Sequence, residues 1–300
     1  MLAYVCIVVL SRFLGVLPLG LALALGRALG TFAFHVVRIR RSVVVSNIRH
    51  CLGATRSEAE VWALARDCYR QFGMTFVELL RSMAGRSTGL ERNVEFDPLD
   101  PFVALRDGKK PVVIIQPHAG NFDLVAYAFA ARGFPHHTVM KALHNERVNE
   151  MIVRTRERHG VIVHLKGSDS YEELLNVLRS GAWAGLLPDQ NAKQRGVTVS
   201  FLGQPASIFK GPALLHLETG APICVAVDER LASDPRRHHV HFGFLAPRPR
   251  TGDDAADVRA IMQDVSDAMT VHILRNPSQY FWFHRLWGKD VAAGRTAAAS

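Results

Sequence analysis

Between residues 111 and 244 the chain alternates short apolar runs with stretches of helical periodicity, and this alternation restricts the fold more than any other feature. The apolar runs begin at Pro111, His137, Val161, Trp183, Pro222 and His238. Helical patterns lie between them over about residues 122–132, 146–159, 170–179 and 210–219. Strands and helices in such alternation form βαβ units, so the sequence predicts an α/β fold with a mostly parallel sheet flanked by helices.

Two helix starts precede this alternation. Ser57 and Glu60 form a capping-box pattern, which predicts a helix from there to about Met83. Asp100 and Pro101 are typical of the N-cap and first turn of a short helix, which we expect to stop at Gly108.

The first 37 residues are almost entirely apolar. Three basic residues interrupt them: Arg12, Arg27 and His35. The longest uninterrupted run, Phe13–Gly26, is shorter than the roughly 20 residues of a typical membrane span. No basic segment precedes the apolar part, as it would in a signal peptide. Two arrangements stay open, a tilted membrane helix over about residues 2–25 or a pair of helices lying in the headgroup layer. A buried core helix is a third alternative.

The charge of the chain points to an anionic partner. Its formal net charge is +9 and its pI is about 9.8, which suits a nucleic acid, a phospholipid surface or a phosphorylated substrate. Three arginines, Arg38, Arg40 and Arg41, directly follow the apolar segment, where they would meet an anionic cytoplasmic membrane face. We therefore expect a membrane-associated helical segment over residues 1–40, an α/β domain over 41–290 and a flexible tail over 291–300.

A polar turn follows the first apolar run of the series. In the stretch PHAGNFD, His118 ends the run and Asp123 comes five residues later. Gly120 and Asn121 allow the chain to fold back, so that Asp123 in the first helical turn could hold one imidazole nitrogen of His118. The other nitrogen would then be free to act as a general base.

Several ordered blocks of the chain, from about Arg41 to Lys289, resemble one known family. They read SVVVSNIRHCLG, FVELLR, HAGNFD, LLPDQNAKQRGVTVSFLGQPASIFKGPALLHLETGAPI and YFWFHRLW. Together they resemble the lysophospholipid acyltransferase superfamily, specifically its lipid A late acyltransferase branch, which also contains the phosphatidylinositol mannoside acyltransferases.

This resemblance implies transfer of a fatty acyl group from an acyl carrier protein or coenzyme A thioester to a hydroxyl of a lipid A precursor or related lipid. It implies work at the cytoplasmic face of the inner membrane, without a metal ion, a cofactor or nucleic acid. His118 would be the catalytic base and Asp123 its orienting carboxylate. The residues expected to bind substrate are Asn121, Arg154, Arg156, Arg158, Asp189 and Gln190. At a position where some relatives carry a glutamate, this chain has Gln204, and Leu286 also departs from the closing block.

Other classes of protein fit less well. No G-x-G-x-x-G follows a strand, which disfavours a dinucleotide enzyme. His239 and His241 share a strand face, but the sequence shows no carboxylate placed to join them in a zinc site. A non-catalytic membrane protein that binds anionic lipid remains the alternative from another class.

Overall fold

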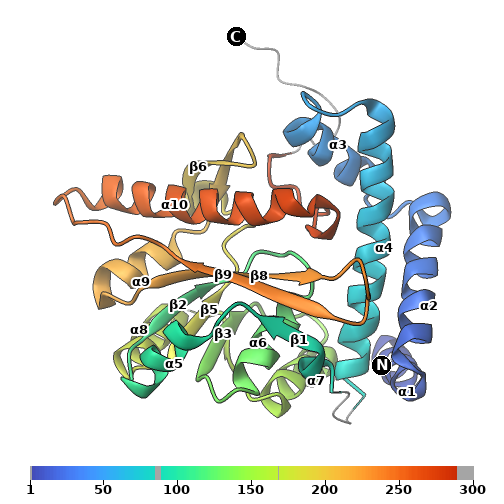
Figure 1. Ribbon diagram of the computed structural model, residues 1–300, viewed down its shortest axis with the longest axis horizontal. Helices are drawn as coiled ribbons and strands as arrows, with labels where there is room; N and C mark the ends of the chain where they lie inside the picture. Colours follow the sequence, from blue (N-terminus) through green and yellow to red (C-terminus); the bar gives the residue numbers. More distant parts are fainter. Residues whose placement is uncertain (1, 85–88, 168, 289–300) are drawn as a thin grey trace.

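The computed structural model describes residues 2–84, 89–167 and 169–288, and its centre is one seven-stranded sheet (Figure 1). The strands lie in the order β1-β9-β8-β2-β5-β3-β4. Their bounds are β1 Val94–Phe96, β2 Val112–Ile115, β3 His136–Met140, β4 Ile162–Leu165, β5 Trp183–Leu186, β8 Ile223–Arg230 and β9 His238–Phe244. Five neighbouring strands, from β8 to β4, are parallel to one another. Strand β9 is antiparallel to β8, and the edge strand β1 is parallel to β9. The predicted α/β fold with a mostly parallel sheet is confirmed.

Helices cover both faces of this sheet because the central strand β2 is apolar on both of its sides. Val112 and Ile114 pack in a cluster with helices α5 (Asp100–Asp107) and α6 (Phe122–Ala130). Val113 and Ile115 pack on the opposite side with helices α8 (Ser170–Arg179), α9 (Gly211–Thr219) and α10 (Asp254–Arg275). All four strand residues have no exposed surface, as expected for a parallel strand buried between two helical layers.

The N-terminal part forms a stack of helices beside the sheet (Figure 1). Its elements are α1 (Leu2–Val16), α2 (Leu19–Phe32), the π-helical turn η1 (Ala33–Val37), α3 (Arg41–Leu52) and α4 (Glu58–Ser82). Helix α7 (Glu146–Arg158), which follows β3, meets α1 at a pocket. Pro18 stands between α1 and α2, since it cannot continue the backbone hydrogen bonds of a helix. The apolar segment therefore forms a pair of helices. The expected alternative of one continuous helix over residues 2–25 was wrong.

Helix α2 lies directly against α4, and glycines permit this contact. A Cβ added to Gly30 would lie 2.1 Å from the carbonyl oxygen of Tyr69, and one added to Gly73 would lie 2.2 Å from that of Gly26. The outward side of α2 remains exposed at Leu21 and Leu29. The segment Leu19–Val37 has a mean hydropathy of 1.5 and is long enough to cross a membrane, and 28% of it is buried inside the protein.

One of the two predicted helix starts agrees with the structure and the other does not. Ser57 and Glu60 form the expected capping box at the start of α4. Helix α5 includes Asp100 as its first residue, and Leu99, which has no side-chain cap, occupies the N-cap, so the assignment of Asp100 as N-cap was wrong. A hairpin of β6 (Val197–Phe201) and β7 (Gln204–Ile208) packs on α10, and the sequence patterns did not indicate either element.

Candidate functional site

His118 stands at the carboxyl edge of the sheet, just beyond β2, and meets a residue from the neighbouring strand. Strand β5 runs parallel to β2, so the chain beyond β5 brings Asp189 to the same edge. The Asp189 side chain is fully buried. Its Oδ1 accepts a hydrogen bond from Nδ1 of His118 at 2.7 Å, and its Oδ2 accepts one from the backbone N–H of His118 at 2.8 Å. One carboxylate thus fixes both the backbone and the ring of His118.

The charge of Asp189 determines which nitrogen of His118 carries the proton. Burial raises the pKa of the Asp189 carboxyl, but the positive charge that the His118 ring carries when protonated, together with hydrogen bonds from its ring and backbone, outweighs this effect and holds the pKa below its usual value. An ionised carboxylate only accepts hydrogen bonds, so Nδ1 of His118 is the protonated nitrogen. The lone pair of Nε2 is then available to take up a proton.

Gln190 links this nitrogen to a second histidine. The Gln190 side-chain nitrogen lies 2.9 Å from Nε2 of His118 and 2.9 Å from Nε2 of His284. Because an amide nitrogen donates, both imidazole nitrogens accept from it. Burial, together with the neighbouring His118, lowers the pKa of His284 to about 4. His284 is therefore neutral near pH 7 and adds no positive charge beside His118.

Asp123 does not contact His118, in contrast to the expectation from the motif. Its Oδ1 instead accepts a hydrogen bond from Nε of Arg156 on α7 at 3.0 Å, and an Nη atom of the same ion pair lies 2.8 Å away. Burial lowers the pKa of Arg156, but Asp123 and Tyr127 raise it by more, so the guanidinium stays charged. The physical reason for the difference is that helix α7 offers a cation to the first turn of α6, while the His118 ring turns toward β5.

Contacts with Asp228 and Glu78 fix the turn that joins His118 to α6. Gly120 has a φ of +59°, and a Cβ there would lie 2.4 Å from both the carbonyl oxygen and Oδ2 of Asp228. Asn121 is buried: its backbone N–H donates to Asp228 at 2.7 Å, its side-chain nitrogen donates to Glu78 at 2.9 Å, and its Oδ1 caps α6 at Leu124. Asn121 was expected to bind substrate, but these contacts occupy its side chain and place it as a support of the turn.

A buried ionic network lies behind this turn. Glu78 accepts two hydrogen bonds from Arg230, at 2.5 and 2.6 Å, and a third from Nε2 of His238 at 3.1 Å. Nδ1 of His238 donates to Asp228 at 2.8 Å. Burial opposes ionisation of Glu78, yet Arg230 and His238 together lower its pKa. Burial also lowers the pKa of His238, but Asp228 and Glu78 raise it to about 9. Two carboxylates are thus matched by two cations.

Aromatic side chains surround the open side of His118. A recess of about 30 Å³ lies there, lined among others by Phe72, Phe122 and Phe281. The centroid of the His118 ring lies 5.0 Å from the ring centroid of Phe122 and 6.4 Å from that of Phe281. This volume is on the order of one water molecule. On α4, Phe72 and Phe76 are about 40% exposed. The candidate site therefore lies beside an aromatic surface.

Three other residues singled out in the sequence lie away from His118. Arg154 and Arg158 are exposed and line a different pocket, between α7 and α1. Gln204 lies in the β6–β7 hairpin, where its side-chain nitrogen donates to the backbone of His50. Gln204 therefore supports packing of the hairpin on the helical part.

The expectation that no carboxylate lies near the histidines of β9 was wrong. Strand β1 brings Asp97 beside β9, where its Oδ1 lies 2.9 Å from Nε2 of His239 and 3.4 Å from Nδ1 of His241. These three side chains together could hold a metal ion. The hydrogen bonds to Asp97 account for the arrangement without an ion, and they help to lower the pKa of Asp97 against the effect of burial.

One further segment, GRSTG at residues 85–89, has the spacing of a serine-hydrolase nucleophile elbow. Such an elbow joins a strand to a helix, whereas this segment comes after helix α4, which ends at Ser82. Residues 85–88 lie outside the described residues. The surrounding elements therefore give no support to a nucleophilic serine here.

A mostly parallel α/β sheet with a carboxylate-bound histidine at its carboxyl edge defines the class: an α/β protein with a candidate acid–base site beside aromatic side chains. Comparison with known families agrees with this class. The family model for "bacterial lipid A biosynthesis acyltransferase" matches residues 1–289. The chain belongs to this family.

Three curated relatives illustrate the range of the family. The phosphatidylinositol mannoside acyltransferase of Mycobacterium tuberculosis (strain CDC 1551 / Oshkosh) is 28% identical over 204 residues, which cover 67% of this chain and 61% of the relative. That of Mycolicibacterium smegmatis is 26% identical over 66% of this chain and 64% of the relative. The lipid A biosynthesis myristoyltransferase of Escherichia coli (strain K12) is 23% identical over 86% of this chain and 78% of the relative. The chain thus spans less than two thirds of the length of the mycobacterial relatives.

Proposed function

We propose that the chain is a membrane-associated acyltransferase that moves a fatty acyl group from a thioester to a hydroxyl of a glycolipid. The donor would be an acyl carrier protein or coenzyme A thioester, and the acceptor a lipid A precursor or a related glycolipid at the cytoplasmic face of the inner membrane. The observation that carries this proposal is the double hydrogen bond from His118 to the buried Asp189, which leaves Nε2 as the accepting nitrogen of a histidine that lines the aromatic recess.

In the proposed mechanism, the acceptor hydroxyl takes the place of the Gln190 amide at Nε2 of His118. Nε2 removes the hydroxyl proton while the oxygen attacks the thioester carbonyl. The tetrahedral intermediate then collapses, the carbon–sulfur bond breaks, and the leaving thiolate receives the proton from Nε2. Asp189 stabilises the imidazolium during this exchange. The products are an ester and a thiol, and no covalent enzyme intermediate is required.

Arg156 and Asp123 have a supporting role in this proposal. Their ion pair ties α7 to the first turn of α6, and that turn follows directly from the segment that carries His118. Asp123 is thus proposed as a positioning residue that acts through Arg156, in place of the direct contact with His118 expected from the motif.

The proposal is tested by incubating the purified chain with a radiolabelled acyl thioester and candidate acceptors, with product detection by mass spectrometry. Acceptors would include a lipid A precursor and a phosphatidylinositol mannoside. His118→Ala should abolish transfer, while His144→Ala, which changes an exposed loop histidine, should not affect it. Vesicle binding by a chain that transfers no acyl group to any acceptor would favour the non-catalytic lipid-binding alternative. Undiminished transfer by His118→Ala would overturn the role of this residue.

A further inference from the structure

Helix α7 carries arginines on two opposite sides. Arg156 points inward to Asp123. At 100° per residue, Arg147, Arg154 and Arg158 fall within about 40° of one another on a helix, whereas Arg156 lies about 180° from Arg147. These three side chains are exposed. The second arginine face of α7 therefore has no part in the ion pair near His118.

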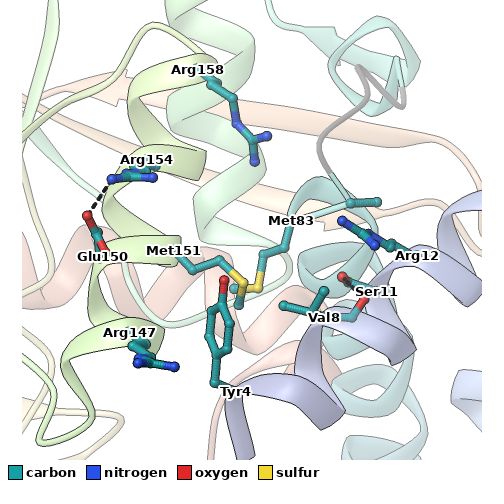
Figure 2. A pocket seen from close by; sticks show the side chains of 11 residues that line it. Tyr4, Val8, Ser11, Arg12, Met83, Arg147, Glu150, Met151, Arg154 and Arg158 are labelled. Atoms are coloured by element: carbon teal, nitrogen blue, oxygen red, sulfur yellow. Dashed lines mark hydrogen bonds and ion pairs between the residues drawn. The ribbon is translucent and has the colours of Figure 1, made fainter. Parts of the chain in front are cut away.

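This second face forms one wall of a pocket. The pocket has a volume of about 280 Å³ and lies between α7, helix α1 and the end of α4. Figure 2 shows the aromatic ring of Tyr4 and the sulfur atoms of Met83 and Met151 meeting at its centre, with arginine side chains around them. It shares no lining residue with the recess at His118. Within the described residues, it is a pocket separate from the candidate site at His118.

The charges of this pocket select an anion. Four guanidinium groups line it, one from α1 and three from α7: Arg12, Arg147, Arg154 and Arg158. The carboxylate that lines it, Glu150, is paired with Arg154 (Figure 2). Positive charge therefore exceeds negative charge by three. Guanidinium groups bind phosphate oxygens in pairs through their planar donors, so a phosphate group suits the rim of this pocket.

The surroundings favour a phosphate that belongs to a lipid. Helix α1 forms the other wall, and its outward side exposes apolar residues: Val5, Val9, Leu10, Phe13 and Val16. An apolar helix surface next to basic side chains is the arrangement of a protein that lies on an anionic bilayer. The interior of the pocket, with Tyr4, Met83 and Met151, can accept the less polar part of a headgroup.

We propose that this pocket binds the phosphate of an anionic phospholipid headgroup and so fixes α1 and α7 at the membrane surface. This inference rests on the membrane association proposed above, but not on the acyl transfer. Its occupant is a lipid of the bilayer in which the protein lies, distinct from the acceptor at His118.

The test is flotation of the full-length protein with vesicles of phosphatidylcholine, with and without phosphatidylglycerol. The double variant Arg12→Gln/Arg147→Gln removes one charge from each wall, and Arg259→Gln removes an exposed charge from α10 as a matched control. The wild type should bind the phosphatidylglycerol vesicles more tightly. The double variant should lose roughly tenfold or more of that preference, since each basic residue near an anionic surface contributes about 1 kcal/mol. Arg259→Gln should keep it.

Two further arms identify the source of the anion. Inorganic phosphate should leave the phosphatidylglycerol preference unchanged, whereas displacement by inorganic phosphate would show a site for free phosphate and overturn the proposal. His118→Ala should bind vesicles like the wild type, so that failure of the acyl transfer leaves this result intact. A double variant with wild-type vesicle preference would also overturn the proposal. If that variant had lost transfer only from an acyl carrier protein, the pocket would be a docking site for an acidic protein.

Discussion

The buried Asp189 carboxylate holds His118 through two atoms, the backbone nitrogen at 2.8 Å and Nδ1 of the ring at 2.7 Å. This arrangement fixes the position of the residue and its tautomer with a single side chain. The carboxylate that follows five residues after the histidine is instead used in an ion pair with Arg156. Two carboxylates therefore have separable functions, and substitution can distinguish them.

Asp189→Asn should reduce turnover roughly 10³- to 10⁴-fold, the size seen when a carboxylate that orients a catalytic histidine becomes an amide. An amide can present a donor to Nδ1, which selects the wrong tautomer, and it cannot stabilise the imidazolium. Steady-state transfer assays measure the effect, with circular dichroism to verify folding. Asp107→Asn, an exposed carboxylate on α5, is the control. A folded Asp189→Asn protein with turnover within a few-fold of wild type would rule out this role.

Asp123→Asn and Arg156→Gln should each destabilise the protein, because each leaves its partially buried partner without a counter-ion. Breaking a fully buried pair costs about 3–5 kcal/mol, and these side chains are 13% and 15% exposed, so we expect about 2–3 kcal/mol for each. The double variant should cost less than the two single changes added together. Thermal and denaturant unfolding of the four proteins measures this coupling.

The same variants compare the two carboxylates in catalysis. Asp123→Asn should lower turnover less than Asp189→Asn does, since its effect reaches His118 only through the position of α6. If Asp123→Asn lost more turnover than Asp189→Asn while still folded, Asp123 would be the carboxylate that orients His118.

Local patterns were sufficient to predict the elements that flank the site. The run PVVIIQ forms the buried strand β2, and Ser57 with Glu60 caps α4 as expected. His118 was found because it follows directly from such a strand, and the carboxyl edge of a parallel sheet is where sites form. These signals depend on residues near one another in the sequence.

The partner of His118 could not be predicted in this way. Asp189 lies 71 positions further along the chain, and it reaches His118 only because β5 is the neighbour of β2 in the sheet. Asp97 meets His239 for a similar reason, since the three-residue strand β1 is too short to give a periodic pattern. Strand order depends on packing between residues far apart in the sequence, so a local sequence pattern cannot predict it.

Gly120→Ala should impair both folding and turnover. Its φ of +59° costs an alanine about 1–2 kcal/mol, and its Cβ would also collide with Asp228 at 2.4 Å. Gly133→Ala is a matched control, because its φ is +77° but nothing lies within 4 Å of the added Cβ. Gly133→Ala should therefore show the backbone strain alone, and keep its turnover. Equal effects of the two variants on turnover would show that contact with Asp228 does not position His118.

His238 should make the stability of the protein depend on pH. In the folded protein its pKa is raised to about 9 from 6.5, since the charges and hydrogen bonds of Asp228 and Glu78 outweigh the effect of burial. Between these two values folded His238 holds a proton that the unfolded chain has released. The stabilisation is therefore complete below about pH 6.5 and is lost as the pH rises through 9. A shift of this size corresponds to about 3 kcal/mol.

Thermal unfolding from pH 6 to pH 10 should show this loss as the difference between the wild type and His238→Gln. The amide of glutamine retains a hydrogen bond but does not titrate. The variant should be less stable than the wild type at pH 6, because the two carboxylates then face one cation, and the gap should narrow as the pH rises. His144→Gln, which changes an exposed loop residue, should follow the wild type throughout. A gap that stays constant across the pH range would show that His238 is not protonated in the folded protein.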